Sequence, residues 1–177
     1  MNSQPEPHIL FTRDEIETTV KKLAGEISQD YNSKHPLLIG VLKGSFIFMA
    51  DLIRHLNFPL EVEFIKLSSY GRGRSTPGKI KIVQGLRSKV RSRDVIIIED
   101  IVDTGHTITF LLDYLKKKRP ASLKLCALTD KPSRRQVPVN IDYLGFTVPD
   151  KFIVGYGIDW DEKFRHLPHI GFVEVED

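Results

Sequence analysis

Two patterns of apolar residues alternate along the chain and divide it into expected strands and helices. Short runs that are almost wholly apolar, such as residues 37–42 and 95–98, favour strands covered on both faces of a parallel sheet. Residues 61–67 alternate polar and apolar positions instead, which favours a half-buried strand. We expect strands at residues 37–42, 61–67, 80–83, 95–98, 123–129, 141–148 and 152–158.

Other segments repeat apolar residues every three or four positions, which predicts amphipathic helices. The first begins with a capping box, Thr12-Arg13-Asp14-Glu15, and its apolar face consists of Ile16, Val20, Leu23, Ile27 and Tyr31. The apolar side of the second is formed by Phe46, Met49, Ile53 and Leu56. The third spans about residues 107–118, stops before Pro120 and buries Ile108, Leu111, Leu112 and Leu115.

This order of elements predicts one α/β domain over residues 1–177, with a mostly parallel sheet and helices on both of its faces. No repeat, low-complexity tract or long linker divides the sequence, and residues 1–8 are expected to be flexible. Residues 68–79 form a long connection rich in Gly, Arg and Ser. Such a connection is either a mobile lid that excludes water, with Ser69 and Tyr70 making polar contacts, or plain surface disorder.

The most informative segment is residues 95–107, where an apolar strand leads into acids and then into a small polar loop. Glu99 and Asp100 are expected at the carboxyl end of the strand, where parallel sheets bind ligands. The loop 104–107 offers backbone N–H groups, two hydroxyls and a helix N-terminus, which favour phosphate, while the acids suit ribose hydroxyls or a metal ion. An acid or threonine here can also be only a helix cap, and neither a Walker A loop nor a dinucleotide fingerprint is present.

Composition and charge narrow the setting of the protein. With 177 residues, 41% of them hydrophobic, and one cysteine, Cys126, the chain suits a single domain in a reducing cytoplasm. No apolar stretch approaches the roughly 20 residues of a membrane span. The formal charge is +3, but residues 66–93 carry nine Lys or Arg and no acid. That segment suits a pyrophosphate-bearing substrate, nucleic acid, or only solvent.

An apolar run, two acids and then acid-Thr-Gly-x-Thr resembles the phosphoribosyl-pyrophosphate motif of the phosphoribosyltransferases. Further segments resemble the 6-oxopurine, or hypoxanthine-guanine, phosphoribosyltransferases in order and spacing: Leu42-Lys43-Gly44-Ser45, Ser69-Tyr70, Lys131 and residues 148–159. The resemblance begins near Ile9 and covers nearly the whole chain. It implies the type I phosphoribosyltransferase fold, with a flexible lid loop and a small hood for the base.

The resemblance implies Mg²⁺-dependent transfer of a 5-phosphoribosyl group from phosphoribosyl pyrophosphate to hypoxanthine or guanine. The products are IMP or GMP and pyrophosphate, and members usually form dimers or tetramers. Asp103 is expected to be the general base that accepts the purine N7 proton. The ribose 5-phosphate and hydroxyls are assigned to Glu99, Asp100, Asp103, Thr104, Gly105, His106 and Thr107.

The remaining roles are carried over in the same way. Pyrophosphate is assigned to Lys43, Gly44 and Arg165, and the family often has a cis peptide at the lysine. Purine is assigned to Ile101, Lys131, Lys151, Phe152, Ile153 and Asp159. Lys131 would donate to the 6-oxo group and disfavour adenine, and Phe152 would stack on the ring. The expected Mg²⁺ ligands are Glu99, Asp100 and Asp159.

Several alternatives stay open. Lys43 and Arg165 can be ordinary surface cations, and Phe152 can be a core residue. His106 and Trp160 depart from the family pattern. His106 could bind phosphate when it is protonated, in which case the affinity would weaken as the side chain loses its proton with rising pH, or it could point to solvent. The other functions considered are a xanthine-preferring or pyrimidine-salvage enzyme, and an RNA-binding regulator that uses residues 66–93. Intact catalytic positions argue against RNA binding as the sole function.

Overall fold

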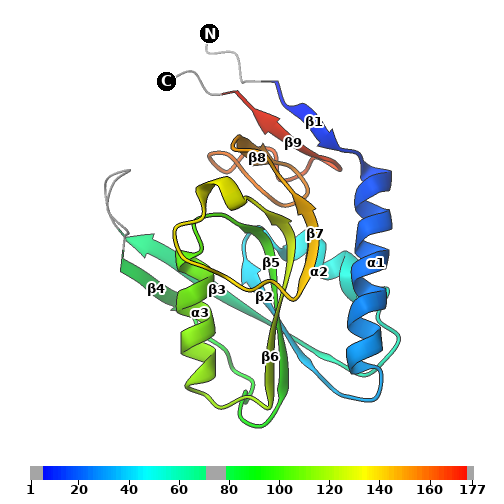
Figure 1. The fold of residues 1–177 in the computed structure, drawn as a ribbon, viewed down its shortest axis with the longest axis vertical. Coiled ribbons are helices and arrows are strands. Elements are labelled where there is room, and N and C mark those ends of the chain that lie inside the picture. The colour runs from blue at the N-terminus through cyan, green and yellow to red at the C-terminus, as the bar shows by residue number, and fades with distance from the viewer. Residues whose placement is uncertain (1–5, 71–78, 175–177) are drawn as a thin grey trace.

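The computed structural model describes residues 6–70 and 79–174, which form two sheets and three α-helices (Figure 1). The central sheet has the strand order β4-β3-β2-β5-β6-β7. Its strands are β2 (Leu37–Leu42), β3 (Glu61–Tyr70), β4 (Lys79–Gln84), β5 (Asp94–Val102), β6 (Ser122–Asp130) and β7 (Tyr143–Thr147). All of its described pairings are parallel except β3 with β4, so the prediction of a mostly parallel sheet is confirmed.

Helices cover both faces of this sheet, as predicted (Figure 1). On one face α1 (Arg13–Tyr31) and α2 (Phe46–Ile53) pack against Leu38, Ile96 and Ile98. On the other, α3 (His106–Lys116) packs against Val95 and Ile97. Because successive side chains of β5 point to opposite faces, its β-branched run supplies both cores.

The two longer helices follow the sequence pattern closely. The capping box of α1 is confirmed, since the Thr12 hydroxyl accepts from the Glu15 N–H while Glu15 accepts from the Thr12 N–H. The expected apolar faces of α1 and α3 are buried, except that Leu112 is only partly covered. For α2 the prediction was partly wrong, because Phe46 is 43% exposed and the buried residues are Phe48, Met49 and Leu52.

A second, antiparallel sheet of order β1-β9-β8 lies beyond the upper ends of β5, β6 and β7 (Figure 1). It consists of β1 (His8–Phe11), β8 (Phe152–Val154) and β9 (Ile170–Val173). The single strand expected at 152–158 was therefore wrong in length and in sheet. It ends at Val154 because Gly155 has a φ of +94°, and a Cβ there would lie 2.1 Å from the His169 carbonyl oxygen.

The connection between β3 and β4 is shorter than predicted. Ser68 pairs with Lys81 and Ser69 with Ile80, so the ladder continues into the segment that was expected to be a loop. Residues 71–78 of the predicted lid lie outside the described residues, whereas its Ser69 and Tyr70 belong to the end of β3, where Tyr70 pairs with Lys79. At the N-terminus, His8 already pairs with Phe172 in the small sheet, although residues 1–8 were expected to be flexible.

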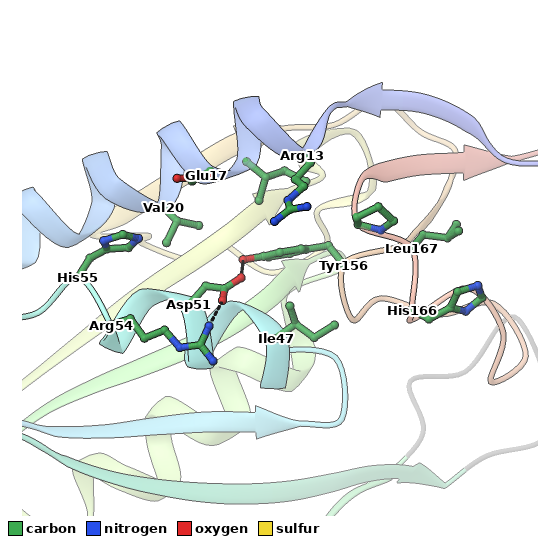
Figure 2. Close-up of a pocket in the computed structure, with 12 residues that line it drawn as sticks. Arg13, Glu17, Val20, Ile47, Asp51, Arg54, His55, Tyr156, His166 and Leu167 are labelled. Carbon is green, nitrogen blue, oxygen red and sulfur yellow. Dashed lines mark hydrogen bonds and ion pairs between the residues drawn. The ribbon is translucent and has the colours of Figure 1, made fainter.

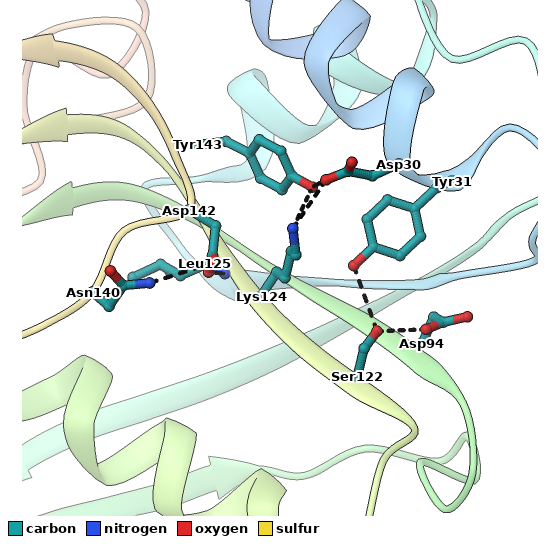
Figure 3. Close-up of polar contacts among 9 residues, drawn as sticks. All are labelled: Asp30, Tyr31, Asp94, Ser122, Lys124, Leu125, Asn140, Asp142 and Tyr143. Atoms are coloured by element: carbon teal, nitrogen blue, oxygen red, sulfur yellow. Dashed lines mark hydrogen bonds and ion pairs between the residues drawn. The ribbon is translucent and has the colours of Figure 1, made fainter.

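Polar contacts hold the carboxyl end of α1 against the starts of β6 and β7 (Figure 3). The Asp30 carboxylate accepts from the Tyr143 hydroxyl and from Lys124 Nζ, the latter at 2.9 Å. The Ser122 hydroxyl donates to Asp94. These contacts lie at the end of the sheet opposite the small sheet, so we assign them to the fold rather than to the site.

Candidate active site

Two buried acids stand at the carboxyl end of β5, between β2 and β6. Glu99 and Asp100 are 6% and 8% exposed, and the Asp100 carbonyl accepts a 2.7 Å bond from the Thr129 hydroxyl. Burial, and then the neighbouring Asp100, raise the pKa of Glu99 well above its usual value. Glu99 Oε2 is buried and has no hydrogen-bond partner within the described part of the chain. Such an oxygen is suited to a cation or a hydroxyl that is brought in by a ligand.

The Lys43-Gly44 loop follows β2 and lies against these acids. The Leu42–Lys43 peptide bond is cis. A Cβ on Gly44 would lie 1.8 Å from Asp100 Oδ2, so only glycine fits there without a shift. From the other side, a Cβ on Gly157, whose φ is +98°, would lie 2.3 Å from the Gly44 carbonyl oxygen. The main chain of this loop is therefore held between Asp100 and Gly157.

The loop between β5 and α3 is anchored by its backbone. Gly105 is the N-cap of α3 with a φ of +92°, and a Cβ there would meet the Val137 carbonyl oxygen at 2.5 Å. The Thr104 carbonyl accepts from the N–H groups of Gln136 and Val137 at 2.9 and 3.1 Å. No side chain caps α3, so the alternative that Asp103 is only a helix cap was wrong. The carboxylate of Asp103 is left available, with Oδ1 lying 3.7 Å from Arg134 Nε.

A cavity of about 170 Å³ brings most of the expected phosphoribosyl residues together. It is lined by Glu99, Ile101, Val102, Asp103, Thr104, Gly105, Thr107 and Ile108. Asp100 and His106 are not part of this lining; the His106 ring Nε2 instead lies 3.0 Å from Gln136 Oε1. The cavity thus combines a buried carboxylate with a helix N-terminus, which is a suitable environment for a sugar phosphate.

Arg135 was missed by the sequence reasoning, although it is the main support of this loop. Its guanidinium donates to the carbonyls of Asp103 (2.9 Å) and Val102 (3.1 Å) and forms an ion pair with Asp130. This fork fixes the backbone that carries Asp103. In the sequence Arg135 is one of several cations after β6, and no spacing distinguishes it from Arg134.

The expected purine residues lie beside this loop and at the start of β8. Lys131 is buried, and its Nζ donates a 2.7 Å bond to the Lys151 carbonyl, while burial lowers its pKa. Ile153 is buried, but Phe152 is 46% exposed, so the alternative that Phe152 is a core residue was wrong. Lys151 Nζ lies 3.1 Å from Glu174. An exposed ring next to a buried ammonium group can receive a flat polar ligand.

Glu162, also missed, joins the two cations that were expected to bind pyrophosphate. Its Oε2 lies 2.8 Å from Lys43 Nζ and 3.3 Å from Arg165 Nη2, and the bond from Lys43 is the main cause of its lowered pKa. Arg165 also lies 2.8 Å from Asp159 and donates to the Gly157 carbonyl at 2.8 Å. The two cations are therefore close enough to act on one anionic ligand.

The acids expected to bind the metal do not form one cluster. In residues 6–70 and 79–174, no three His, Cys, Asp or Glu side chains converge as a metal site would require. Asp159 is engaged with Arg165 and with the Glu162 N–H, whereas Glu99 has a free buried oxygen. The roles assigned to these residues stay predictions. None of the helices in the same ranges has the length and apolar character needed to cross a membrane.

Comparison with known proteins places this geometry in a family. The phosphoribosyl transferase domain matches residues 10–161. The hypoxanthine-guanine phosphoribosyltransferase of Streptococcus thermophilus is 44% identical over 168 residues, which is 95% of this chain and 93% of that protein. The bifunctional protein TilS/HprT of Listeria innocua is 43% identical over 95% of this chain, but the chain spans only 26% of its length.

A solved structure agrees with these matches. The crystal structure of a hypoxanthine-guanine phosphoribosyltransferase from Bacillus anthracis, with a HEPES molecule in its active site, has a TM-score of 0.91 and 43% identity to this chain. The match covers 97% of this chain and 100% of the other. The predicted fold is confirmed, and the chain belongs to the phosphoribosyl transferase domain family.

Proposed function

We propose that the protein transfers the 5-phosphoribosyl group of phosphoribosyl pyrophosphate to hypoxanthine or guanine in purine salvage. The bond from the sugar C1 to pyrophosphate breaks, a bond from C1 to purine N9 forms, and the purine gives up a proton. The observation that carries the proposal is the 170 Å³ cavity, in which the buried Glu99 and the Asp103 loop meet the start of α3. The activities named for the relatives from Streptococcus thermophilus and Bacillus anthracis support it.

The sugar phosphate would lie in this cavity. Its 5-phosphate would accept from the backbone N–H groups of residues 104–107 and from the hydroxyls of Thr104 and Thr107, at the positive end of the α3 dipole. Its ribose hydroxyls would donate to Glu99 and Asp100. The free oxygen of Glu99 supports this assignment, because a buried carboxylate without a partner gains most from a donor.

Mg²⁺ fits the same acids. It prefers oxygen ligands and is usually held by one or two carboxylates together with substrate phosphates. Glu99 and Asp100 can provide the carboxylates. When bound, Mg²⁺ would neutralise charge on the leaving pyrophosphate. Asp159 would join the ligands only by sharing its carboxylate with Arg165, from which it lies 2.8 Å.

Pyrophosphate would replace the Glu162 carboxylate as the anion that is bound by Lys43 and Arg165. Glu162 already occupies both cations with one carboxylate oxygen, so it stands in for an anion between them. The main chain at Gly44 lies close to the Asp100 carboxylate, because Gly44 has no side chain. This arrangement supports a pyrophosphate position next to the acids.

Asp103 would accept the purine N7 proton as N9 attacks the sugar. Its carboxylate is not used by α3, and its backbone is fixed by Arg135. The purine would stack on Phe152, with its 6-oxo group on Lys131 and the main chain at Ile153 at its opposite edge. A 6-amino group, as in adenine, would place a donor against the Lys131 ammonium group, so adenine is disfavoured.

The base preference tests this proposal. The protein is incubated with phosphoribosyl pyrophosphate and Mg²⁺, and separately with hypoxanthine, guanine, xanthine, adenine and uracil, while nucleotide formation is followed. Turnover of hypoxanthine or guanine without adenine is expected. A clear preference for xanthine or uracil would instead select another enzyme of the same fold. Turnover with no base would reject the proposal and leave the RNA-binding regulator as the next hypothesis.

A homo-oligomer and a cytoplasmic location are also proposed, on the resemblance to the family alone. Sedimentation of the purified protein would test the first, since a dimer or tetramer is expected. For the RNA alternative, the described basic residues give mixed support, because Arg93 lies 2.7 Å from Glu61 and is not simply solvated.

A further inference from the structure

A second cavity lies away from the candidate active site, between α1, α2 and the loop that follows β8 (Figure 2). Its volume is about 390 Å³, which is within the range of roughly 300–1,000 Å³ found for small-molecule pockets. It shares no lining residue with the 170 Å³ cavity. No role in the proposed transfer is assigned to any of its residues.

The lining combines a flat apolar surface with cations. The apolar part consists of the Tyr156 ring with Ile16, Val20, Ile47, Leu167 and Pro168. Figure 2 shows Arg13, from α1, on one side of this ring and Asp51, from α2, with Arg54, which follows α2, on the other. A pocket of this kind suits a ligand with an aromatic body and one polar group.

The lining carries two arginines and two carboxylates, and Arg13 is the charge with which an anionic ligand could pair. The two carboxylates of the lining are already paired, Asp51 with Arg54 at 3.1 Å and Glu17 with Lys21 at 2.5 Å. Arg13 forms no hydrogen bond or ion pair among the described residues, although its charge is one of the causes, after Lys21, of the lowered pKa of Glu17. It also lies in the first turn of α1, where the helix dipole adds to its positive potential. The other titratable residues of the lining are His55, His166 and Tyr156.

The part of the cavity lined by Tyr156 lies next to the Lys43-Gly44 loop. The Tyr156 hydroxyl donates a 2.7 Å bond to Asp51, and the next residue, Gly157, lies against the Gly44 carbonyl. Ile47 is three residues past Gly44 in the chain and lines the same cavity. A ligand that contacts Tyr156 and Ile47 therefore contacts the residue before Gly157, which lies against Gly44, and a residue three positions after Gly44.

We propose that this cavity is a second ligand site, which takes a small aromatic carboxylate or phosphate and changes the affinity for phosphoribosyl pyrophosphate. The carboxylate or phosphate group pairs with Arg13, and the aromatic body lies on Tyr156 and Leu167. The coupling rests on the proposed function, because it acts through the Lys43-Gly44 loop. The binding step does not, and it is measured separately.

Benzoate is the probe, and saturation-transfer NMR on the full chain measures its Kd. Saturating IMP is present throughout, so that the candidate active site is occupied. Arg13→Gln should weaken benzoate binding about tenfold, because it removes a charge-assisted bond. Leu167→Trp should abolish binding by filling the cavity. Arg91→Gln, a solvated arginine changed in the same way at the other end of the sheet, should leave the Kd unchanged.

Kinetics then test the coupling. Saturating benzoate should change the KM for phosphoribosyl pyrophosphate at least threefold in the wild type and not in Arg13→Gln. Loss of the NMR signal in IMP, or equal Kd values for wild type and Arg13→Gln, would overturn the site. Binding without a change in KM would overturn the coupling. An inactive protein that still binds benzoate through Arg13 would reject the proposed transfer but not this site.

Discussion

At the scale of single residues, the account depends on what each side chain is left free to do. Asp103 is adjacent to a helix but does not cap it, and Glu99 is buried with an unused oxygen. Gly44 matters through the side chain that it lacks, because Asp100 occupies that space. Each of these features separates a functional role from a structural one, and each leads to a substitution with a distinct readout.

Asp103→Asn should remove the proposed general base and leave the fold intact. We expect kcat to fall by about 10²–10⁴, the usual contribution of a general base, while the melting temperature stays within experimental error. The melting temperature is spared because Asp103 makes no cap to α3. Matched kinetics and melting curves check this, and a variant that keeps wild-type kcat would remove Asp103 from the role.

Gly44→Ala should disturb the Lys43-Gly44 loop, because the new Cβ would lie 1.8 Å from Asp100 Oδ2. We expect the KM for phosphoribosyl pyrophosphate to rise more than the KM for the purine, with a loss of about 1–3 kcal/mol in the free energy of unfolding. Gly25→Ala is the control, since nothing lies within 4 Å of its Cβ. Because Gly25 lies within helix α1, Gly25→Ala should raise the free energy of unfolding by about 0.5–1 kcal/mol. Unchanged kinetics in Gly44→Ala would contradict the loop assignment.

The raised pKa of Glu99 should appear in the pH dependence of stability. In the folded protein Glu99 holds its proton to a pH well above its usual value of 4.5, whereas in the unfolded chain it ionises near that value. The folded state therefore binds more protons, and this residue's contribution to stability falls as pH rises from about 4.5 towards the raised pKa.

Glu99→Gln removes this ionisation. As pH rises through that window, the free energy of unfolding of the variant should increase relative to that of the wild type by up to about 1.4 kcal/mol per pH unit. Urea unfolding of both proteins, without ligand, from pH 4 to 8 measures the difference. A difference that does not vary with pH would show that Glu99 titrates normally.

At the scale of elements, the sequence pattern was most reliable where one element buries a continuous apolar face. The run at residues 95–98 and the capping box before Ile16 each predicted an element that is present. The small sheet was harder, because β1 and β9 have four residues each and pair residues as distant as His8 and Phe172. Hydrophobic periodicity cannot be recognised over so few residues. The strand expected at 152–158 failed for the same reason, since Gly155 ends it after three residues.

Loop residues were the least predictable part of the site. Acids and small residues near Asp103 could be found because their order is distinctive, but Arg135 and Glu162 act through tertiary contacts that no local spacing encodes. Arg135 joins the carboxyl end of β6, through Asp130, to the loop before α3. It thus supports two elements at once, which makes it testable at this scale.

Arg135→Lys should loosen the loop between β5 and α3, because an ammonium group cannot reproduce the guanidinium fork to two carbonyls and a carboxylate. We expect kcat/KM for phosphoribosyl pyrophosphate to fall at least about tenfold. Arg134→Lys is the control, since Arg134 lies 3.7 Å from Asp103 and makes no such fork. Equal effects of the two substitutions would indicate that charge near Asp103 matters and the fork does not.

At the scale of the whole molecule, the proposed sugar-phosphate site belongs to the central sheet and part of the proposed purine site to the small sheet. The Lys43-Gly44 loop follows the carboxyl end of β2, and the acids lie at the carboxyl end of β5. Strand β8 begins with the exposed Phe152. The purine and the sugar phosphate would therefore meet between the two sheets, as Figure 1 allows. This arrangement makes transfer between two bound substrates the central claim.

The most direct test follows both products of one reaction. Purified protein, hypoxanthine, phosphoribosyl pyrophosphate and Mg²⁺ are mixed, and IMP and pyrophosphate are measured over time in the same sample. The account predicts that the two products appear in equal amounts and that chelation of Mg²⁺ stops both. Pyrophosphate release without IMP, or no consumption of phosphoribosyl pyrophosphate, would contradict it.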